Sequence, residues 1–573
     1  MAKGPRSQIT TTDFPPFNKV VILHFGPLFA VALALAATPA FSQQVPNAGV
    51  QLQQLPPAPR PQQQLPEIRI ERPGAPSAPV AAGPVITVNT LTITGATRFA
   101  PAVLVTASGF TPGATLSFAD LQTLAVRITK YYTDRGYFVA QAYLPAQDVG
   151  GGNVTIAIVE GRYGKIALNN SSRLSDRVAN RILSGLKPGD IVASAALERR
   201  LLLLSDLPGI GVSSVLSPGT DIGTADLAVD ILPGRPVNGV IEADNAGNRY
   251  TGDWRGGGTL NINNPAGIGD LLSLRVLAST QGLIYGRAAY QAPVGVTTVG
   301  VAFAHIGYQL GREFKSLDAS GTADVASVYA SHPLLRSRRA NVQLLANGDA
   351  KWFTDRVRTT GAESRRTTHV LGLGLAGDGR DGGAFTTWSA GAAFGDLALK
   401  TPADRAIDAL TARAEGNYVV VRAAAARQQP LVGALSLYLA ARGQVASRNL
   451  DSSEKLQLGG AYGVRAYPEG EAFGDEGFLA TAEVRVLLPE TAGLPGRVQL
   501  FGFIDTGSVR IARNPWFTGP NTLNRSGYGG GVAWNAPGNF LVKVSYARKL
   551  GTGPATSAPD QDGRFWLQIA KYF

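Results

Sequence analysis

The chain has 573 residues, of which 16% are charged, 68 are glycine and none is cysteine. The lack of cysteine excludes disulfides, thiolate nucleophiles and cysteine-ligated metals, and four scattered histidines do not suggest a metal cluster. The net charge of +12 arises without a dense run of lysine or arginine, so anionic lipid or an arginine-lined channel fits it better than nucleic acid does.

Residues 1–42 are predicted to be a signal peptide. A polar, basic segment precedes an apolar run that Gly26 and Pro27 interrupt, and small residues around Ala40 (TPA or AFS) offer a cleavage site. A permanent membrane helix is the alternative, but the uninterrupted apolar run is short for a membrane-spanning helix. No later segment approaches the roughly 18 apolar residues that a spanning helix needs, so any membrane span is expected to consist of strands.

Residues 43–84 are rich in proline, glutamine and alanine and are predicted to be a linker. This composition buries no core and favours extended, polyproline-like conformations. Plain disorder is the preferred interpretation. A short helix around Val50 to Leu55, acting as a plug, is the alternative.

Residues 85–161 are predicted to fold as a small α/β module. The segment VITVNTLTITG alternates as a strand, and YFVAQAYLP and NVTIAIVEG supply two more. Between them, apolar residues recur at helical spacing. Ser117 and Asp120 resemble a capping box at the start of that helix, and Gly136 is placed to end it.

Residues 162–235 are predicted to repeat the same order of elements. GKIALNN reads as a strand, Ser175–Leu183 and Ala195–Leu207 as helices, and GVSSVLSPG and TADLAVDILPG as two further strands. Two modules of about 75 residues therefore form an internal repeat without obvious residue identity.

Residues 236–573 are predicted to form a transmembrane β-barrel. Segments of about ten residues alternate with period two and are separated by turns rich in Gly, Asn, Asp and Pro. In FLATAEVRVLLP, for example, Glu483 and Arg485 lie on one strand face and Val484 and Val486 on the other. A large soluble β-sandwich shows the same alternation, but the export signal and the absence of cysteine favour the barrel.

The number of strands follows from the length of this region. Residues 236–573 number 573 − 235 = 338. Because a spanning strand of roughly 9 to 11 residues is followed by a turn or loop of comparable size, about 16 strands are expected. The last strand ends at Phe573, on one face with Phe565, Leu567 and Ile569, and this resembles the C-terminal assembly signal of bacterial outer-membrane barrels.

Residues 456–478 are predicted to be a long loop between two of these strands. The segment is glycine-rich and acidic and carries one arginine, Arg465. Its acidic residues, Glu469, Glu471, Asp475 and Glu476, are expected to form a polar loop surface. Such a loop is ordered only where other parts of the chain hold it.

Nearly the whole mature chain resembles the two-partner secretion transporters of the bacterial outer membrane, the hemolysin and filamentous-hemagglutinin exporter type. The residues that carry the resemblance are YYTDRGYFVAQAYLPAQDVGGGNVTIAIVEGR, DNAGNRYTG, NNPAGIGDLL, GVRAYPEGEAFGDEGF and FGFIDTG. It implies a sixteen-stranded barrel, periplasmic POTRA domains at residues 85–161 and 162–235, and a barrel at 236–573 with an inward-folding loop at 456–478.

The resemblance also implies the roles of individual residues. Arg465 would anchor the inward loop to Asp505. Strand parity places Phe501 and Phe503 on the same face as Asp505, where the folded-in loop would cover them. The loop motif comprises Gly463, Val464, Tyr467, Gly474 and Asp475. The family usually has glycine where this chain has Ala466. A solvated, unpaired Arg465 is the alternative; a bidentate ion pair would fix the loop in both distance and orientation.

The expected function is export of a large β-helical partner protein in unfolded form from the periplasm to the cell surface. The partner would pair with POTRA sheet edges, cross the barrel as the loop and linker yield, and fold outside. Outer-membrane lipid, lipopolysaccharide and the barrel-assembly machinery are further expected partners, and no cofactor, metal or catalytic residue is expected.

Other classes of protein fit less well. GLGLAG (Gly372–Gly377) matches a dinucleotide-binding pattern but precedes no helix, so an enzyme is not expected. An outer-membrane assembly factor would carry more POTRA repeats, and a passive porin would need none.

Overall fold

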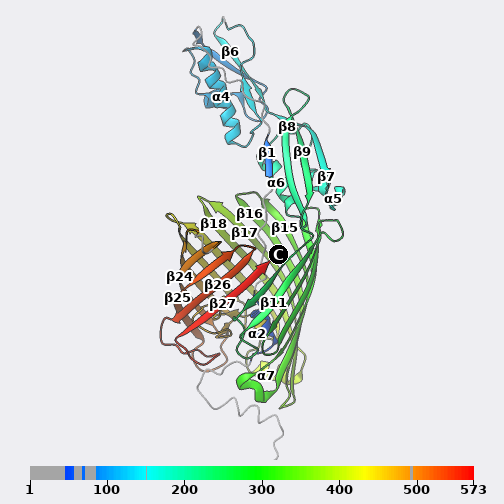
Figure 1. The fold of residues 1–573 in the computed structure, drawn as a ribbon, viewed down its shortest axis with the longest axis vertical. Helices are drawn as coiled ribbons and strands as arrows, with labels where there is room; N and C mark the ends of the chain where they lie inside the picture. The colour runs from blue at the N-terminus through cyan, green and yellow to red at the C-terminus, as the bar shows by residue number, and fades with distance from the viewer. Residues whose placement is uncertain (1–45, 57–66, 71–84, 150, 491–494) are drawn as a thin grey trace, which may run out of the picture. The chain divides into compact units, whose positions relative to one another are not determined.

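The computed structural model describes residues 46–56, 67–70, 85–149, 151–490 and 495–573. The predicted signal peptide lies outside these residues. Within the described ranges, no helix is both long and apolar enough to cross a membrane. The described elements form two α/β modules and a closed barrel, which confirms the predicted, mostly β fold class (Figure 1).

The first module packs two helices against a three-stranded sheet. Strand β6 (Asn153–Val159) lies between β3 (Thr90–Thr94), to which it is parallel, and β5 (Gln141–Tyr143), to which it is antiparallel. The other elements are β2 (Ile86–Val88), α3 (Pro101–Ser108), β4 (Ala114–Leu116) and α4 (Phe118–Asp134).

Helix α4 is placed by the signals that its sequence contains. Ser117 and Asp120 form a reciprocal capping box at its start, and Gly136 follows its end with a φ of +88°. Its apolar face, including Leu124 and Ile128, packs against alternating residues of β3 and β6 to form the module's core.

The second module contains β7 (Arg162–Asn170), α5 (Asp176–Leu183), α6 (Ser194–Ser205), β8 (Ile210–Pro218) and β9 (Thr224–Pro233). Its sheet has the order β1-β8-β9-β7, and the added strand β1 (Glu67–Ile70) comes from the predicted linker and pairs in parallel with β8. This differs from a fully unstructured linker. An extended segment becomes a strand wherever a free sheet edge accepts it, and composition alone does not reveal such an edge.

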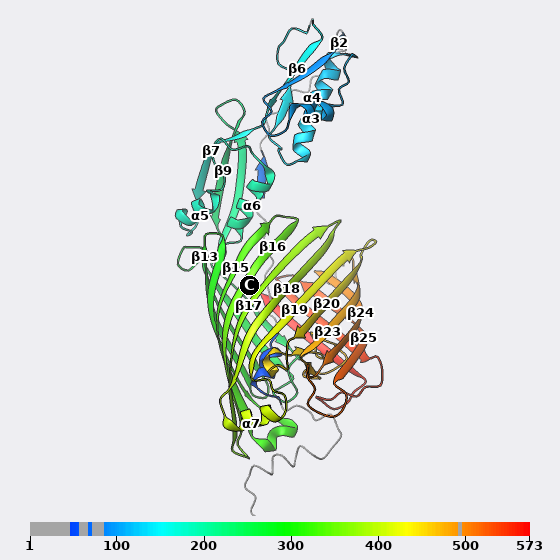
Figure 2. The same cartoon turned by 180° about the vertical axis from the view of Figure 1, so that it is seen from behind.

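The barrel has sixteen antiparallel strands, which confirms the number estimated from length. In order they are β10 (Val237–Asp244), β11 (Arg255–Asn263), β12 (Leu271–Ser279), β13 (Leu283–Val294), β14 (Thr297–Gln309), β15 (Ala319–Arg336), β16 (Ala340–Val357), β17 (Ala362–Asp381), β18 (Ala384–Leu399), β19 (Gly416–Pro430), β20 (Leu435–Ala446), β23 (Glu476–Leu487), β24 (Arg497–Arg510), β25 (Thr522–Ala536), β26 (Phe540–Lys549) and β27 (Gly563–Tyr572). Figures 1 and 2 show the tilted strands from opposite sides.

The barrel closes where β27 pairs with β10. The terminal Phe573 extends this seam, because its backbone exchanges hydrogen bonds with Gly239. A Cβ atom at position 239 would lie 2.5 Å from the Phe573 ring, so glycine is needed there. The side chain of Phe573 is 45% exposed, on the outer face that it was predicted to share with Phe565 and Ile569.

The two ends of the barrel differ in their connections. We call the end at which β10 begins the near end, because the second module leads directly into it, and the opposite end the far end. Short turns join most strands at the near end. The far end carries the long connections, including η1 (Arg312–Leu317) and α7 (Pro402–Leu410), and α7 is visible at this end in Figure 2.

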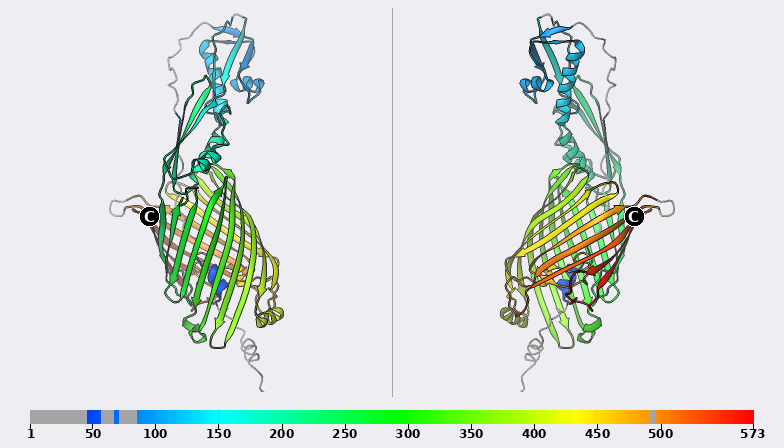
Figure 3. Two further views of the ribbon diagram at one scale, coloured as in Figure 1. Left: turned by 90° about the vertical axis from the view of Figure 1, so that its right-hand side faces the viewer. Right: turned by 90° about the vertical axis from the view of Figure 1, so that its left-hand side faces the viewer.

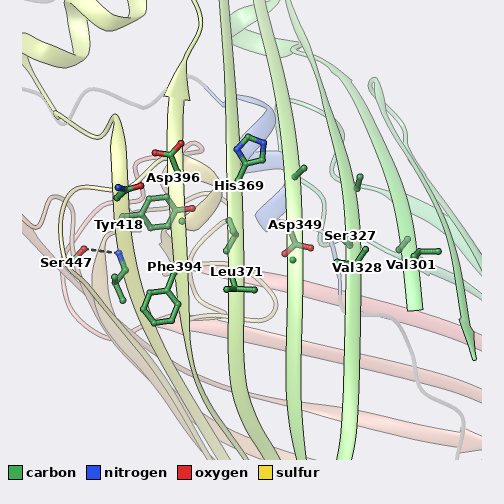
Figure 4. A pocket seen from close by; sticks show the side chains of 18 residues that line it. Val301, Ser327, Val328, Asp349, His369, Leu371, Phe394, Asp396, Tyr418 and Ser447 are labelled. Carbon is green, nitrogen blue, oxygen red and sulfur yellow. Dashed lines mark hydrogen bonds between the residues drawn. The ribbon is translucent and has the colours of Figure 1, made fainter. Parts of the chain in front are cut away.

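Strand parity separates an apolar outer wall from a polar lumen, as predicted. On β23 and β24, Val484 and Ile504 are exposed on the outer face, while Glu483 and Asp505 are buried on the inner one. Figure 4 shows part of the outer wall over β14 to β19. Leu371 and Phe394 pair across neighbouring strands there, and two residues nearer the far end His369 pairs with Asp396, where the apolar band gives way to polar side chains.

Candidate functional site: the loop inside the barrel

The segment between β20 and β23 folds into the lumen. Residues 456–475, here called the lumen loop, begin with β21 (Leu456–Gln457) and end with β22 (Phe473–Gly474), and these two short strands pair with each other. η2 (Ser452–Glu454) precedes the loop. The apolar loop side chains Leu458, Val464, Ala466 and Tyr467 are almost fully buried and pack with Phe501 and Phe503. The loop is therefore part of a hydrophobic core inside the barrel and not a solvent-exposed loop.

Arg465 lies at the tip of this loop and contacts two carboxylates. Its Nε and Nη2 atoms donate to the two oxygens of Asp505, each at a distance of 2.7 Å, and its Nη1 donates to Glu483 at 2.7 Å. Its backbone N–H also donates to Asp505, over 3.2 Å. The fork-shaped guanidinium thus fixes both the position and the orientation of the loop tip.

The surroundings of Arg465 keep it charged. Its Cζ lies 3.4 Å from the centroid of the Phe503 ring. Burial alone would lower the pKa of Arg465, but the hydrogen bonds and negative charges of Asp505 and Glu483 raise it above its usual value. Trp566 on β27 donates its indole N–H to the Arg465 carbonyl over 2.7 Å, which ties the tip to a third wall strand.

Close backbone approaches explain the small residues of the motif. A Cβ atom at Gly463 would lie 2.4 Å from the Leu458 carbonyl oxygen, and one at Gly474 would lie 2.6 Å from Val509. Gly527 on β25 leaves room for Ala466, because a Cβ atom added at position 527 would lie 2.4 Å from the Cβ of Ala466. The glycine in the wall therefore accommodates the methyl group of Ala466.

The remaining motif residues hold the two sides of the loop. The Val464 N–H donates to the Leu458 carbonyl over 2.9 Å, and the Tyr467 hydroxyl donates to the Gly553 carbonyl over 3.2 Å. Asp475 is fully buried and accepts from Lys455 and from the backbone N–H of Leu450 and Arg513.

The prediction that the acidic residues form a polar loop surface is wrong for three of the four. Glu469, Glu471 and Asp475 are 6%, 3% and 0% exposed. Glu471 pairs with Arg525 of β25 over 2.8 Å and accepts from the backbone of Thr556. Sequence composition suggested solvent exposure, but the lumen wall supplies cations and the loop brings the matching carboxylates.

Sequence reasoning missed Glu483 as a partner of Arg465. Strand parity had placed Glu483 on the polar face, and its neighbour in register is Phe503, which lies under the guanidinium. On the lumen face, the pair of Glu483 with Phe503 is next to the pair of Thr481 with Asp505. A lumen-facing carboxylate this close to Asp505 was the signal that could have identified Glu483.

A short helix, α2 (Ala48–Gln53), also occupies the lumen, two residues earlier than the predicted alternative (Figure 3). Ala48 packs with apolar side chains of the inner wall, including Tyr285 and Ile306. The carbonyl of Gln54 accepts from Arg255 over 2.9 Å, and that of Pro56 accepts from Arg275 over 3.1 Å. Buried wall and tertiary partners, absent from any local pattern, make this segment ordered.

The helix and the far-end segment before the lumen loop share one polar cluster. The side chain of Asn47 caps α2 and accepts from Ser452 over 2.8 Å. Arg366 of β17 lies 2.6 Å from Asp355 and 2.7 Å from Asp451, and Asp355 also accepts from the Ala48 N–H. Both fillers of the lumen are therefore held by polar contacts in addition to their apolar packing.

The described residues contain no group of three or more histidine, cysteine, aspartate or glutamate side chains arranged to hold a metal ion. Most acidic side chains of the site pair instead with arginine or lysine, as Glu471, Asp475, Glu483 and Asp505 do. The arrangement is suited to holding a loop and a helix in a channel.

The buried Glu469 predicts a pH dependence of the loop. Burial raises the pKa of Glu469 to about 7, with Arg255 and hydrogen bonds from Gln457 and Ala461 only partly opposing this and Asp244 adding to it. Because the folded pKa exceeds the value of about 4.3 for an unfolded glutamate, the loop's stability is highest below that value and falls as pH rises through about 7. Hydrogen-exchange protection of the loop backbone should decrease accordingly.

In Glu469→Gln this decrease should disappear, because the side chain stays neutral. Glu363→Gln, at the far-end start of β17 and away from the loop, should keep the full pH dependence. An unchanged pH dependence in Glu469→Gln would show that another group titrates.

Comparison with known proteins places these features in a family. The family profile described as "Haemolysin secretion/activation protein ShlB/FhaC/HecB" matches residues 223–532, more than half of the chain, and that described as "POTRA domain, ShlB-type" matches residues 86–161. The heme/hemopexin transporter protein HuxB of Haemophilus influenzae (strain 86-028NP) is 29% identical over 471 residues, which cover 80% of this chain and 82% of HuxB. The outer membrane transporter CdiB of Dickeya dadantii is 24% identical over 363 residues, covering 61% of this chain and 63% of CdiB.

Solved structures share the fold. CdiB from Escherichia coli superposes with a TM-score of 0.69 at 21% identity, covering 88% of this chain and 93% of that one. CdiB from Acinetobacter baumannii gives 0.62 at 20% identity, with 89% and 95% covered. Because the family profile spans most of the barrel and the first module matches a POTRA domain of the same type, the chain belongs to the ShlB/FhaC/HecB family of haemolysin secretion/activation proteins, the outer-membrane transporters of two-partner secretion.

Proposed function

We propose that this transporter exports a large β-helical partner in unfolded form through the barrel lumen, and that the Arg465-anchored loop and α2 hold the lumen shut between export events. The observation that carries the proposal is the triple contact of Arg465 with Asp505 and Glu483 inside a closed sixteen-stranded barrel. A lumen of this width is an aqueous channel unless something fills it. Here two segments fill it through polar bonds that water or a passing chain can replace.

We further propose the division of the chain. Residues 1–42 are the signal peptide, 43–84 a linker that contains the plug helix α2, 85–161 and 162–235 two periplasmic POTRA domains, and 236–573 the barrel. The barrel's near end is then periplasmic and its far end extracellular. The exposed apolar wall meets outer-membrane lipid, including lipopolysaccharide, and Phe573 acts as the signal read by the barrel-assembly machinery. The chain carries out transport without an enzymatic step.

The Arg465 anchor is tested by Arg465→Ala. Removing the guanidinium leaves the buried Asp505 without its cation, while Glu483 keeps its ion pair with Arg485. We expect a loss of roughly 3–5 kcal/mol in the local stability of the loop. The barrel should still assemble, as judged by its resistance to denaturation in detergent, while secretion of the partner falls sharply. Arg442→Ala is the matched control. Arg442 contacts the loop through a single hydrogen bond to the carbonyl of Tyr462 and pairs with no carboxylate there, so its loss should reduce secretion much less. Wild-type secretion from Arg465→Ala would refute the anchoring role.

Release of α2 is tested by locking the helix in place. A Cβ added at Gly49 would lie 2.4 Å from the Ser452 Oγ, so cysteines at the two positions are placed to form a disulfide with a small adjustment. The chain has no cysteine of its own, which prevents other pairings. The variant Gly49→Cys, Ser452→Cys should stop exporting when oxidised and resume on reduction, and Ser452→Cys alone should export in both conditions. Export through the oxidised double variant would show that α2 stays in place during transport.

Capture of the partner is assigned to the POTRA sheet edges. Strands β3 and β5 are the edges of the three-stranded sheet of the first module, and β7 is an edge of the second, while β1 covers the β8 edge. A free edge binds an extended chain by main-chain hydrogen bonds. Deleting Val85–Arg162 should abolish binding of the partner in a pull-down, and undiminished binding would remove the capture step from the mechanism.

A further inference from the structure

The near end of the lumen has an unusual lining. A cavity of about 1830 Å³ lies there, and its wall includes six carboxamide side chains from six strands: Asn238, Asn261, Gln291, Gln428, Gln499 and Asn535. Each lies within three residues of the near end of its strand. The registers place all six on the lumen face, since Asn238 pairs with Asn261, and Asn535 pairs with Arg497 two residues before Gln499.

This lining contrasts with the far half of the lumen. There, charged residues are buried in close pairs, such as Arg255 with Asp244 and Arg275 with Glu242. The charged side chains that line the near cavity are Asp206, Arg235 and Arg497. The carboxamides outnumber them, so the near end offers hydrogen bonding with little net charge.

The carboxamides retain unused hydrogen-bonding capacity. Asn261 donates to Asn238 over 2.9 Å, Gln291 accepts from Tyr329, and Gln428 accepts from Arg485. These bonds leave the side-chain N–H groups of Gln291 and Gln428 available. Within the described part of the chain, the side chains of Gln499 and Asn535 make no hydrogen bond that would occupy them. A carboxamide has two N–H donors and a carbonyl oxygen with two lone pairs, so it can pair with both the C=O and the N–H of a peptide group.

Apolar side chains lie between the carboxamides. Leu271, Leu541 and Tyr572 line the same cavity. An unfolded chain exposes both peptide groups and apolar side chains, and each net hydrogen bond to it is weak. Such a wall can hold a chain without reading its sequence and without trapping it by charge.

We propose that the near end of the lumen is a vestibule that binds the peptide backbone of an extended, unfolded polypeptide independently of its sequence. The proposal rests on the function proposed above, in which the partner crosses the lumen. It adds a binding site that acts after the POTRA edges and before the lumen loop. The occupant is the partner's main chain, recognised by hydrogen bonds from the carboxamide ring.

Site-specific photo-crosslinking tests the position of the partner. A photoreactive p-benzoylphenylalanine at Gln499 should capture the partner during export, whereas the same residue at Leu500, which is 41% exposed on the outer wall, should not. Export with no cross-link at Gln499 would overturn the vestibule while leaving export through the barrel intact. If the unmodified chain exports nothing, the proposed function fails first.

Removal of hydrogen-bonding groups tests the chemistry. Loss of one net hydrogen bond of typical strength weakens binding about fivefold, so the double variant Gln428→Leu, Gln499→Leu should export at least several-fold more slowly at an unchanged amount of folded barrel. The double variant with asparagine at both positions keeps the carboxamides and should recover much of the rate. Gln309→Leu, on the outer face at the far end, should export normally.

The effect of the double leucine variant should be the same for passenger segments of different sequence. A normal rate from that variant, or a loss confined to one passenger sequence, would refute sequence-independent binding.

Discussion

The structure depends on a buried guanidinium that holds two carboxylates from the barrel wall. Arg465, Asp505 and Glu483 come from the lumen loop, β24 and β23, so one side chain joins the filler of the lumen to two neighbouring strands. Glu483 has a second cation in Arg485, so the Arg465 contact is needed chiefly to offset the cost of burying Asp505. The contact therefore defines one position of the loop, and Ala466, Gly527 and Trp566 are arranged around that position.

The two halves of the lumen use polar groups in different ways. In the far half, buried charged side chains form ion pairs, such as Arg525 with Glu471 and Lys351 with Glu454. The near half presents neutral amides with free hydrogen-bonding capacity. A chain that enters from the near end thus meets weak, exchangeable partners before it meets the strong pairs that close the path. Because both sets are polar, water can replace each contact that is broken, which an apolar plug would not allow.

Sequence alone predicted what local patterns encode. Alternation identified the lumen faces of β23 and β24, length gave the strand number, and Ser117 with Asp120 marked the start of α4. The pairing of Arg465 with Asp505 came from the family resemblance, since no local pattern joins residues 40 positions apart. The burial of Glu469 and Glu471 and the order in α2 escaped prediction because they depend on distant partners. Asn47 and Ser452, for example, are 405 positions apart.

The connection between α2 and β1 has a consequence for how the barrel reseals. Ten residues, 57–66, join Pro56 at the end of the α2 segment to Glu67 at the start of β1, which pairs with β8 of the second module. If α2 leaves the lumen, these ten residues keep it tethered to the same molecule. The short linker sets the effective concentration of α2 at the lumen in the millimolar range. Its return is intramolecular and does not depend on how many transporters the membrane contains. In the proposed export cycle, the channel is open only while a passing chain occupies the lumen, and α2 of the same molecule is then the nearest segment that can close it.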